Sequence, residues 1–86
     1  MAKGTIRYWA AAKAAAGVGE EPYDASTLAG AIAAAALKEG RNGDFERVIA
    51  RSSFLVNGDP VGTRDHDGVA LPEGGVVEVL PPFAGG

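Results

Sequence analysis

The sequence ends with the stretch Val76-Val77-Glu78-Val79-Leu80-Pro81-Pro82-Phe83-Ala84-Gly85-Gly86, which joins a predicted strand to a predicted extended arm. Side chains alternate along a strand, so Val77 and Val79 share one face, and Glu78 and Leu80 share the other. The two prolines fix φ and remove two backbone donors, so the chain after Leu80 neither continues a sheet nor forms a helix. We therefore expect a folded domain before the prolines and an extended tail from them onward.

The tail, residues 81–86, has a composition that suits a reactive chain end better than a packed element of the domain. Gly85 and Gly86 lack side chains, so a terminal carboxylate can enter a slot too narrow for other residues. Fully extended, these six residues reach at most about 20 Å, enough to enter a recessed site on a partner. A frayed chain end is the alternative interpretation. The Pro-Pro-Phe run favours the arm, with the carboxylate of Gly86 as the candidate reactive group and residues 1–80 as the domain that holds it.

Composition limits the class of protein. With 86 residues, the chain should form one domain with one modest core. It contains no cysteine, which excludes disulfides, thiolate metal sites and a thiol nucleophile within this chain. If sulfur chemistry is involved, the reacting sulfur must be imported. Eight Lys and Arg residues against eleven Asp and Glu give a net charge of −3 without a basic run, which argues against nucleic-acid and membrane partners. Lys13 interrupts the alanine-rich N-terminal stretch, so we expect neither a signal segment nor a membrane span, and predict a cytoplasmic protein.

Residues 5–10 alternate as a half-buried strand does, with Ile6, Tyr8 and Ala10 on the inner face. Trp9 then points away from the core and is either a surface accident or a docking anchor.

The other elements follow from the same patterns: a short helix at residues 11–16 ended by Gly17, a strand at 20–24, a helix at 27–39 stopped by Gly40, a shorter helix after Asp44, a strand at 54–56, and a hairpin at Asn57-Gly58.

The longer helix, residues 27–39, should be capped by Ser26 or Asp24. Its apolar stripe runs through Leu28, Ala31, Ile32 and Ala35, and its alanines favour close packing on a sheet over a surface for a partner helix. Leu37 lies off that stripe and is expected to meet the next segment.

The shorter helix should be capped by Asp44, with Phe45, Val48 and Ile49 recurring at helical spacing. Arg41, Arg47 and Arg51 around it are expected to form a solvated face. Asp65-His66-Asp67 resembles a set of metal ligands, but a loop is the preferred interpretation, and no metal site is predicted.

These elements assemble into an α+β domain in which one main helix covers one face of a mixed sheet. The other face stays open, and strand parity places Trp9 and Leu80 on it, beside the start of the tail.

Several stretches together resemble one family: the Ile6-Arg7-Tyr8-Trp9-Ala10 strand, the Asn57-Gly58 hairpin, the Glu73-Gly74-Gly75-Val76-Val77 turn and the Leu80–Gly86 ending. The chain resembles the MoaD/ThiS-type sulfur carriers of the ubiquitin-like β-grasp fold, and among them the small subunits of molybdopterin synthase. Phe83 stands where members of that family often carry a smaller residue.

The resemblance implies a carrier that is not an enzyme by itself. An ATP-dependent activating enzyme would adenylate Gly86, a sulfur donor would form a thiocarboxylate, and the large subunit of molybdopterin synthase would use that sulfur. The resemblance also implies a heterotetramer with two large subunits, and no cofactor bound by this chain. Partner contacts are expected at Trp9, Leu80, Pro81, Pro82, Phe83 and Ala84, with Gly85 beside the reactive Gly86. Carriers for thiamine thiazole or cysteine, and ubiquitin-like modifiers, share the di-glycine ending and remain open.

Overall fold

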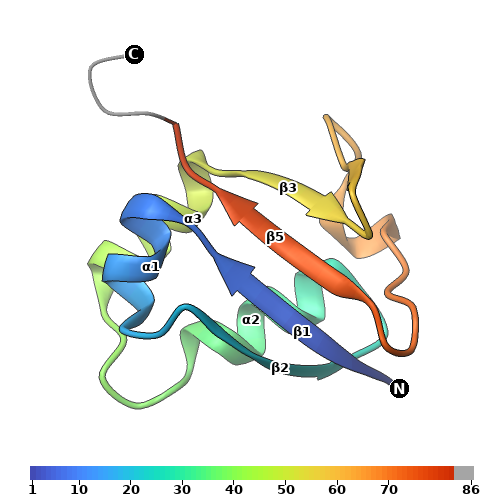
Figure 1. Cartoon of the computed structure of the whole chain (residues 1–86), viewed down its shortest axis with the longest axis horizontal. Coiled ribbons are helices and arrows are strands. Elements are labelled where there is room, and N and C mark those ends of the chain that lie inside the picture. Colours follow the sequence, from blue (N-terminus) through green and yellow to red (C-terminus); the bar gives the residue numbers. More distant parts are fainter. Residues whose placement is uncertain (83–86) are drawn as a thin grey trace.

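Five strands form one mixed sheet in the computed structural model, which describes residues 1–82 (Figure 1). The strands are β1 (Ala2–Tyr8), β2 (Glu20–Ala25), β3 (Ser53–Val56), β4 (Asp59–Pro60) and β5 (Val76–Leu80), in the spatial order β2-β1-β5-β3-β4. β1 is parallel to β5, and the other neighbouring strands are antiparallel. The predicted α+β class and mixed sheet are confirmed.

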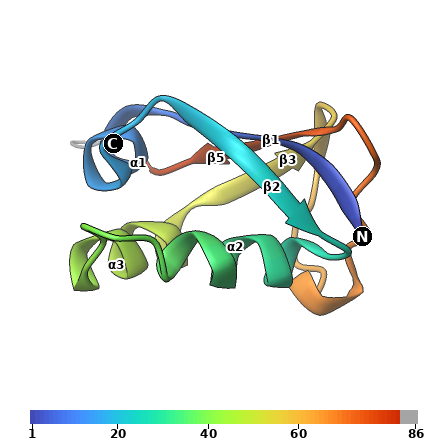
Figure 2. The same ribbon diagram turned by 90° about the horizontal axis from the view of Figure 1, so that it is seen from below.

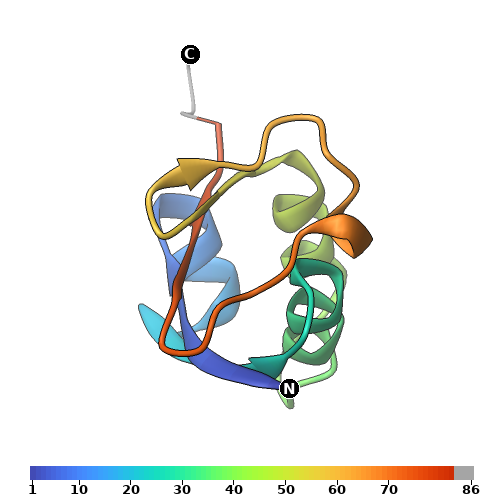
Figure 3. The same ribbon diagram turned by 90° about the vertical axis from the view of Figure 1, so that its right-hand side faces the viewer.

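Helices cover one face of this sheet. α2 (Leu28–Ala36) and α3 (Gly43–Arg51) lie beneath it, and α1 (Ala10–Ala16) lies at one end (Figure 2). The helix expected to be shorter, α3, is as long as α2, with nine residues each. The segment between β4 and β5 crosses from the sheet to the helix layer and returns, and it contains the 3₁₀ turn η1 (His66–Gly68) (Figure 3). Two backbone bonds attach this segment to the start of α2, Leu28 N–H to Val69 at 2.9 Å and Leu71 N–H to Ser26 at 2.9 Å.

The core lies between the inner face of the sheet and the two covering helices. β5 shows why: Val77 and Val79 are buried, whereas Glu78 and Leu80 on the opposite face are half-buried, as the alternation predicted. Burying a Val, Leu or Phe side chain contributes about 1.5–3 kcal/mol, so this face supplies much of the stability. The other buried apolar side chains are Ile6, Tyr8, Ala12, Tyr23, Ala25, Leu28, Ala31, Ala35, Phe45, Phe54, Val61, Val69 and Leu71.

Both predicted helix caps were wrong, by one or three residues for α2 and by two for α3. Thr27 caps α2, because its backbone is extended and its Oγ1 accepts the Gly30 N–H at 3.1 Å. Asn42 caps α3, since its Oδ1 accepts the N–H of Asp44 at 2.9 Å. Asp44 instead lies in the first turn of α3, where its charge favours the positive end of the helix dipole.

α2 ends earlier than the sequence suggested, at Ala36 rather than near Glu39. Leu37 is the C-cap and is 87% exposed, so the expectation that it meets the next segment was wrong. The physical reason is that the chain turns away at Gly40, which has φ 85°, and Arg41 enters the interior instead of Leu37.

β1 also ends early, at Tyr8, so Ala10 does not join the inner face as predicted. Ala10 has φ 48° and begins α1, and this left-handed residue lets the chain turn sharply from strand into helix. The hairpin at Asn57-Gly58 is confirmed: the two residues have φ 51° and 83°, as a two-residue type I′ turn requires.

None of the helices within residues 1–82 has the length and apolar composition that a membrane span needs.

Candidate functional site

The tail leaves the sheet at the end of β5. Leu80 pairs with Ser53 of β3, and Tyr8, the last residue of β1, pairs with Val79. The neighbouring strand β1 has therefore already ended when the chain reaches the prolines. Pro81 is half-buried and Pro82 is exposed. The remaining predicted tail residues, Phe83, Ala84, Gly85 and Gly86, lie outside the described residues.

Trp9 lies beside this exit, on the face that no helix covers. Its backbone N–H donates to the carbonyl of Val79 at 3.2 Å, which attaches it to the last strand. Its side chain is 45% exposed, and Nε1–H donates to Oε2 of Glu78 at 3.0 Å. The predicted outward position of Trp9 is confirmed. The bond to Glu78 was not predicted, because it depends on the register that sets Arg7 opposite Glu78.

We call the surface formed by Arg7, Trp9, Leu55, Val76, Glu78 and Leu80 the open face. Strand alternation and pairing place these residues together, since Glu78 lies between Arg7 of β1 and Leu55 of β3. The strand residues of this set are half-buried, and Figure 2 shows that the covering helices lie on the opposite side of the sheet. The open face thus offers apolar area next to the tail exit, with Trp9 oriented by a hydrogen bond before any partner arrives.

A buried ion pair on the other side of the sheet was missed by the sequence analysis. Arg41 was expected on a solvated face, but its side chain is 5% exposed and that of Glu21 is 9% exposed. Two parallel hydrogen bonds join them, from the guanidinium to Oε2 at 2.7 Å and to Oε1 at 2.9 Å. Tyr8 also donates its hydroxyl to Glu21, and Lys38 Nζ lies 3.0 Å from Oε1. We call Tyr8, Glu21, Lys38 and Arg41 the polar cluster.

Arg41 also connects the helices. Its guanidinium donates to the Ala35 carbonyl at 2.8 Å and to the Ala16 carbonyl at 3.3 Å, near the C-terminal ends of α2 and α1, where helix carbonyls lack intrahelical partners. The guanidinium carbon lies 4.7 Å from the centre of the Phe45 ring of α3 and 5.6 Å from that of Tyr8. One side chain therefore contacts three helices and two strands.

The polar cluster shifts the pKa values of its members. Burial alone would raise the pKa of Glu21, but hydrogen bonds from Arg41, Tyr8 and Lys38 outweigh burial and lower this pKa to about 2. Burial and the bond to Glu21 raise the pKa of the Tyr8 hydroxyl above its ordinary value. Glu21 is thus ionised and Tyr8 neutral at neutral pH, which suits a structural role. A signal was present in the sequence: Glu21 shares the inward parity of Tyr23, and an inward carboxylate needs a cation.

The Asp65-His66-Asp67 segment lies in and beside η1. The His66 ring packs edge-on against Phe54, with ring centres 4.9 Å apart. Within residues 1–82, no group of three or more potential metal-ligating side chains is gathered. His66 therefore has a packing contact that accounts for its position.

Comparison with known proteins gives one family match and several structural ones. The chain matches the ThiS family over residues 6–86. None of the curated proteins matches its sequence. The solved structure of small archaeal modifier protein 1 from Methanosarcina acetivorans has a TM-score of 0.82 at 20% identity, covering 100% of this chain and 98% of that one. The same modifier from Haloferax volcanii has a TM-score of 0.76 at 22% identity, covering 98% and 99%. A proposed molybdopterin converting factor, subunit 1, from Pyrococcus furiosus has a TM-score of 0.74 at 26% identity, covering 96% and 100%.

Proposed function

The chain belongs to the ThiS family, a family of ubiquitin-like carriers rather than enzymes, and from this membership we propose that it carries sulfur as a thiocarboxylate on Gly86. The observation that carries the proposal is the extent of the family match, which runs through the folded domain and the tail to residue 86. The fold supports it, because the chain leaves the sheet after Leu80, through Pro81 and Pro82, beside the open face.

The chemistry requires an activating enzyme. A terminal carboxyl has a pKa of roughly 3.3–3.7, so at neutral pH its oxygen is ionised and attacks the α-phosphorus of ATP, with pyrophosphate as the leaving group. A donor then supplies sulfur at the sulfide level, whose electron pair forms the carbon–sulfur bond of the thiocarboxylate, and AMP leaves with the electron pair of the broken carbon–oxygen bond. The activating enzyme uses the ATP, and this chain supplies the carboxylate and the docking surface.

We propose molybdopterin synthesis as the destination of the sulfur, with this chain as the small subunit of molybdopterin synthase. Two observations support this choice over thiamine thiazole or cysteine synthesis. The Pyrococcus furiosus protein shares 26% identity and is covered over its full length. The Leu80-Pro81-Pro82 arm of this chain resembles the ending of small molybdopterin-synthase subunits. The partners are then the large synthase subunit and the adenylating enzyme.

The open face supplies the affinity for these partners. Ordering each residue of the tail costs about 1–2 kcal/mol of backbone entropy, and Gly85 and Gly86 have no apolar area to offset that cost. Burying Trp9 or Leu80 contributes about 1.5–3 kcal/mol apiece, and Phe83 can add a similar amount. Pro81 and Pro82 reduce the freedom that binding removes. We therefore propose that Trp9 and Leu80 dock, and that Pro81, Pro82, Phe83 and Ala84 lead Gly86 into the partner's site.

Intact mass spectrometry tests the carrier proposal. The full chain is incubated with an activating enzyme, ATP and a sulfur source, and a variant lacking Gly86 is treated in parallel. We expect an oxygen-to-sulfur mass increase that localises to Gly86 and is absent from the variant. The untreated spectrum also shows whether Gly86 is the last residue of the mature chain. An unchanged mass for the full chain, in a reaction where the enzyme converts its own partner, would refute the proposal.

A second candidate is attachment of Gly86 to lysines of other proteins. The whole-chain likeness to two small archaeal modifier proteins raises it, although at 20% and 22% identity that likeness concerns the fold alone. This activity predicts adducts that resist reducing agents and leave Gly-Gly remnants on lysine after proteolysis. Complementation of a molybdopterin-deficient strain, without such adducts, would favour the sulfur carrier.

A further inference from the structure

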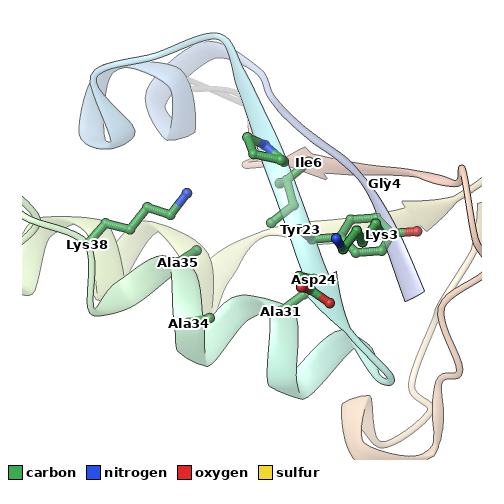
Figure 4. Close-up of a pocket in the computed structure, with 10 residues that line it drawn as sticks. Lys3, Gly4, Ile6, Tyr23, Asp24, Ala31, Ala34, Ala35 and Lys38 are labelled. Carbon is green, nitrogen blue, oxygen red and sulfur yellow. The ribbon is translucent and has the colours of Figure 1, made fainter. Parts of the chain in front are cut away.

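A groove of about 430 Å³ lies between β2 and α2. Figure 4 shows Lys38 near one end of it, and Lys3 and Asp24 near the other. The helix side is formed by Ala31, Ala34 and Ala35, whose side chains stop at Cβ and leave the space beside the edge of β2 unfilled. This volume falls in the range of pockets that bind ligands.

The strand beside the groove has unpaired backbone groups. The N–H of Tyr8 donates to the carbonyl of Gly19 at 2.8 Å. Hydrogen-bonded positions alternate along an antiparallel pair, so every second residue of β2 after Gly19 also bonds to β1. The backbone groups of Glu20, Pro22 and Asp24 consequently face outward. β2 is the last strand on this side of the sheet described for residues 1–82. Pro22 lacks an N–H, but the outward groups of Glu20 and Asp24 and the Pro22 carbonyl remain for a further strand.

Lys38 is the charged side chain that lines one end of the groove. Glu21 already accepts two hydrogen bonds from Arg41, and Lys38, which is 43% exposed, is its second cation. These three side chains sum to a net charge of +1. At the opposite end, Lys3 faces Asp24 across the β1–β2 pair, so those charges balance. The groove therefore complements an apolar strand with a carboxylate at the Lys38 end.

A second copy of this chain fits the edge poorly. Symmetric antiparallel pairing about Pro22 would set Glu20 of each copy against Asp24 of the other, and like charges directly opposite each other are destabilising. A separate peptide with apolar and acidic residues avoids this repulsion.

We propose that the groove binds an extended, acid-flanked apolar segment of another protein, which adds as a sixth strand beside β2 and places a carboxylate at Lys38. Main-chain hydrogen bonds to Glu20, Pro22 and Asp24 hold it along the edge of β2, and alternate apolar side chains enter the space over Ala31, Ala34 and Ala35. β1 separates β2 from β5 in the sheet, so this site is distinct from the open face beside the end of β5.

Three synthetic, end-capped peptides serve as probes against the full chain labelled with nitrogen-15. All share a core of alternating Val and Thr. The first is flanked by Glu at both ends, the second by Lys, and the third repeats the first with two core residues replaced by Pro. We expect the acidic peptide to shift amide resonances of β2 and α2 saturably. The basic peptide should bind about five-fold more weakly, in line with an exposed ion pair. The proline peptide should not bind, because it lacks strand donors.

Two neighbouring alanines of α2 provide the matched variants. Both Ala33 and Ala34 are exposed, but only Ala34 lines the groove. Ala34→Phe should fill the groove and weaken binding at least about ten-fold, whereas Ala33→Phe should leave it unchanged. Lys38→Gln should weaken the acidic peptide about three-fold, and Lys13→Gln on α1 should not.

Several results would overturn the proposal. These are no saturable shift up to about 1 mM acidic peptide, shifts centred on the open face, or equal effects of Ala33→Phe and Ala34→Phe. If the free chain dimerises and Ala34→Phe abolishes the dimer, the groove binds a second copy, and this result would also overturn the proposal. Thiocarboxylate formation on Gly86 should be the same in Ala34→Phe as in the unmodified chain, so this proposal and the carrier proposal fail separately.

Discussion

Two carboxylates of the same sheet, Glu21 of β2 and Glu78 of β5, lie in opposite surroundings. Glu21 faces the helices, is 9% exposed, and accepts hydrogen bonds from Arg41, Tyr8 and Lys38. Glu78 lies on the open face and accepts a hydrogen bond from Trp9 at 3.0 Å. Glu21, on the inner face, thus joins distant elements of the fold, whereas Glu78, on the open face, orients a side chain for a partner. Changes at the two positions should therefore affect different measurements.

The largest expected effect is on the inner side. Arg41→Ala leaves Glu21 as a buried charge without its main partner and should lower the free energy of unfolding by about 3–5 kcal/mol in urea titrations. Because this could prevent folding, Arg41→Lys is measured in parallel and should show a smaller loss, since lysine lacks the planar fork. Arg47→Ala, at a side chain that is 73% exposed, is the control and should change stability by less than about 0.5 kcal/mol. Equal effects of Arg41→Ala and Arg47→Ala would contradict the role of the polar cluster.

The acid dependence of stability is the next effect. The pKa of Glu21 falls from 4.5 to about 2 on folding, so its contribution is present above pH 4.5 and is lost as the pH falls toward 2. The lost contribution should be on the order of 3 kcal/mol. Urea unfolding between these pH values should show a drop in the unmodified chain that is missing from Glu21→Gln. Parallel curves for the two proteins would show that Glu21 is not the group responsible.

On the outer side, Trp9→Ala should weaken binding to the activating enzyme or the large subunit by about 1.5–3 kcal/mol in calorimetry, because the indole is lost from the interface. Its free energy of unfolding should change by less than about 1 kcal/mol, since the side chain is 45% exposed. Leu37→Ala is the matched control, at an apolar side chain that is 87% exposed outside the open face, and it should alter neither quantity. A loss of stability without a loss of affinity would place Trp9 in the fold rather than in the docking surface.

The smallest effect is expected at Glu78. Glu78→Gln keeps an oxygen that can accept the Trp9 Nε1–H, so stability and partner affinity should each change by less than about 0.5 kcal/mol. Glu78→Ala removes the acceptor and should alter the emission of the chain's single tryptophan. If Glu78→Ala leaves that emission unchanged while Trp9→Ala weakens binding, the hydrogen bond does not orient the indole.

Much of the fold could be predicted from local patterns. The alternation in β5, the left-handed turn at Asn57-Gly58 and the Gly17 stop after α1 follow from residues close together in sequence. The helix caps were missed because Ser26, Thr27 and Asp24 all suit capping, and the backbone angles decide among them. For the candidate site, the outward positions of Trp9 and Leu80 were predicted from parity. Glu78 was not linked to Trp9, since their contact depends on the parallel pairing of β1 with β5.

Most strand faces, the turns, the prolines that end the sheet and the family could be predicted from the sequence, because periodicity, backbone preference and motifs depend on residues that are neighbours in the chain. The surroundings of the charged residues depended on the three-dimensional fold. Arg41 looked like a surface cation, yet it lies against Glu21, twenty positions earlier in the chain, and against the ends of two helices. The physical reason is that the cost of a buried charge is offset by groups near in space, and packing alone sets which groups those are.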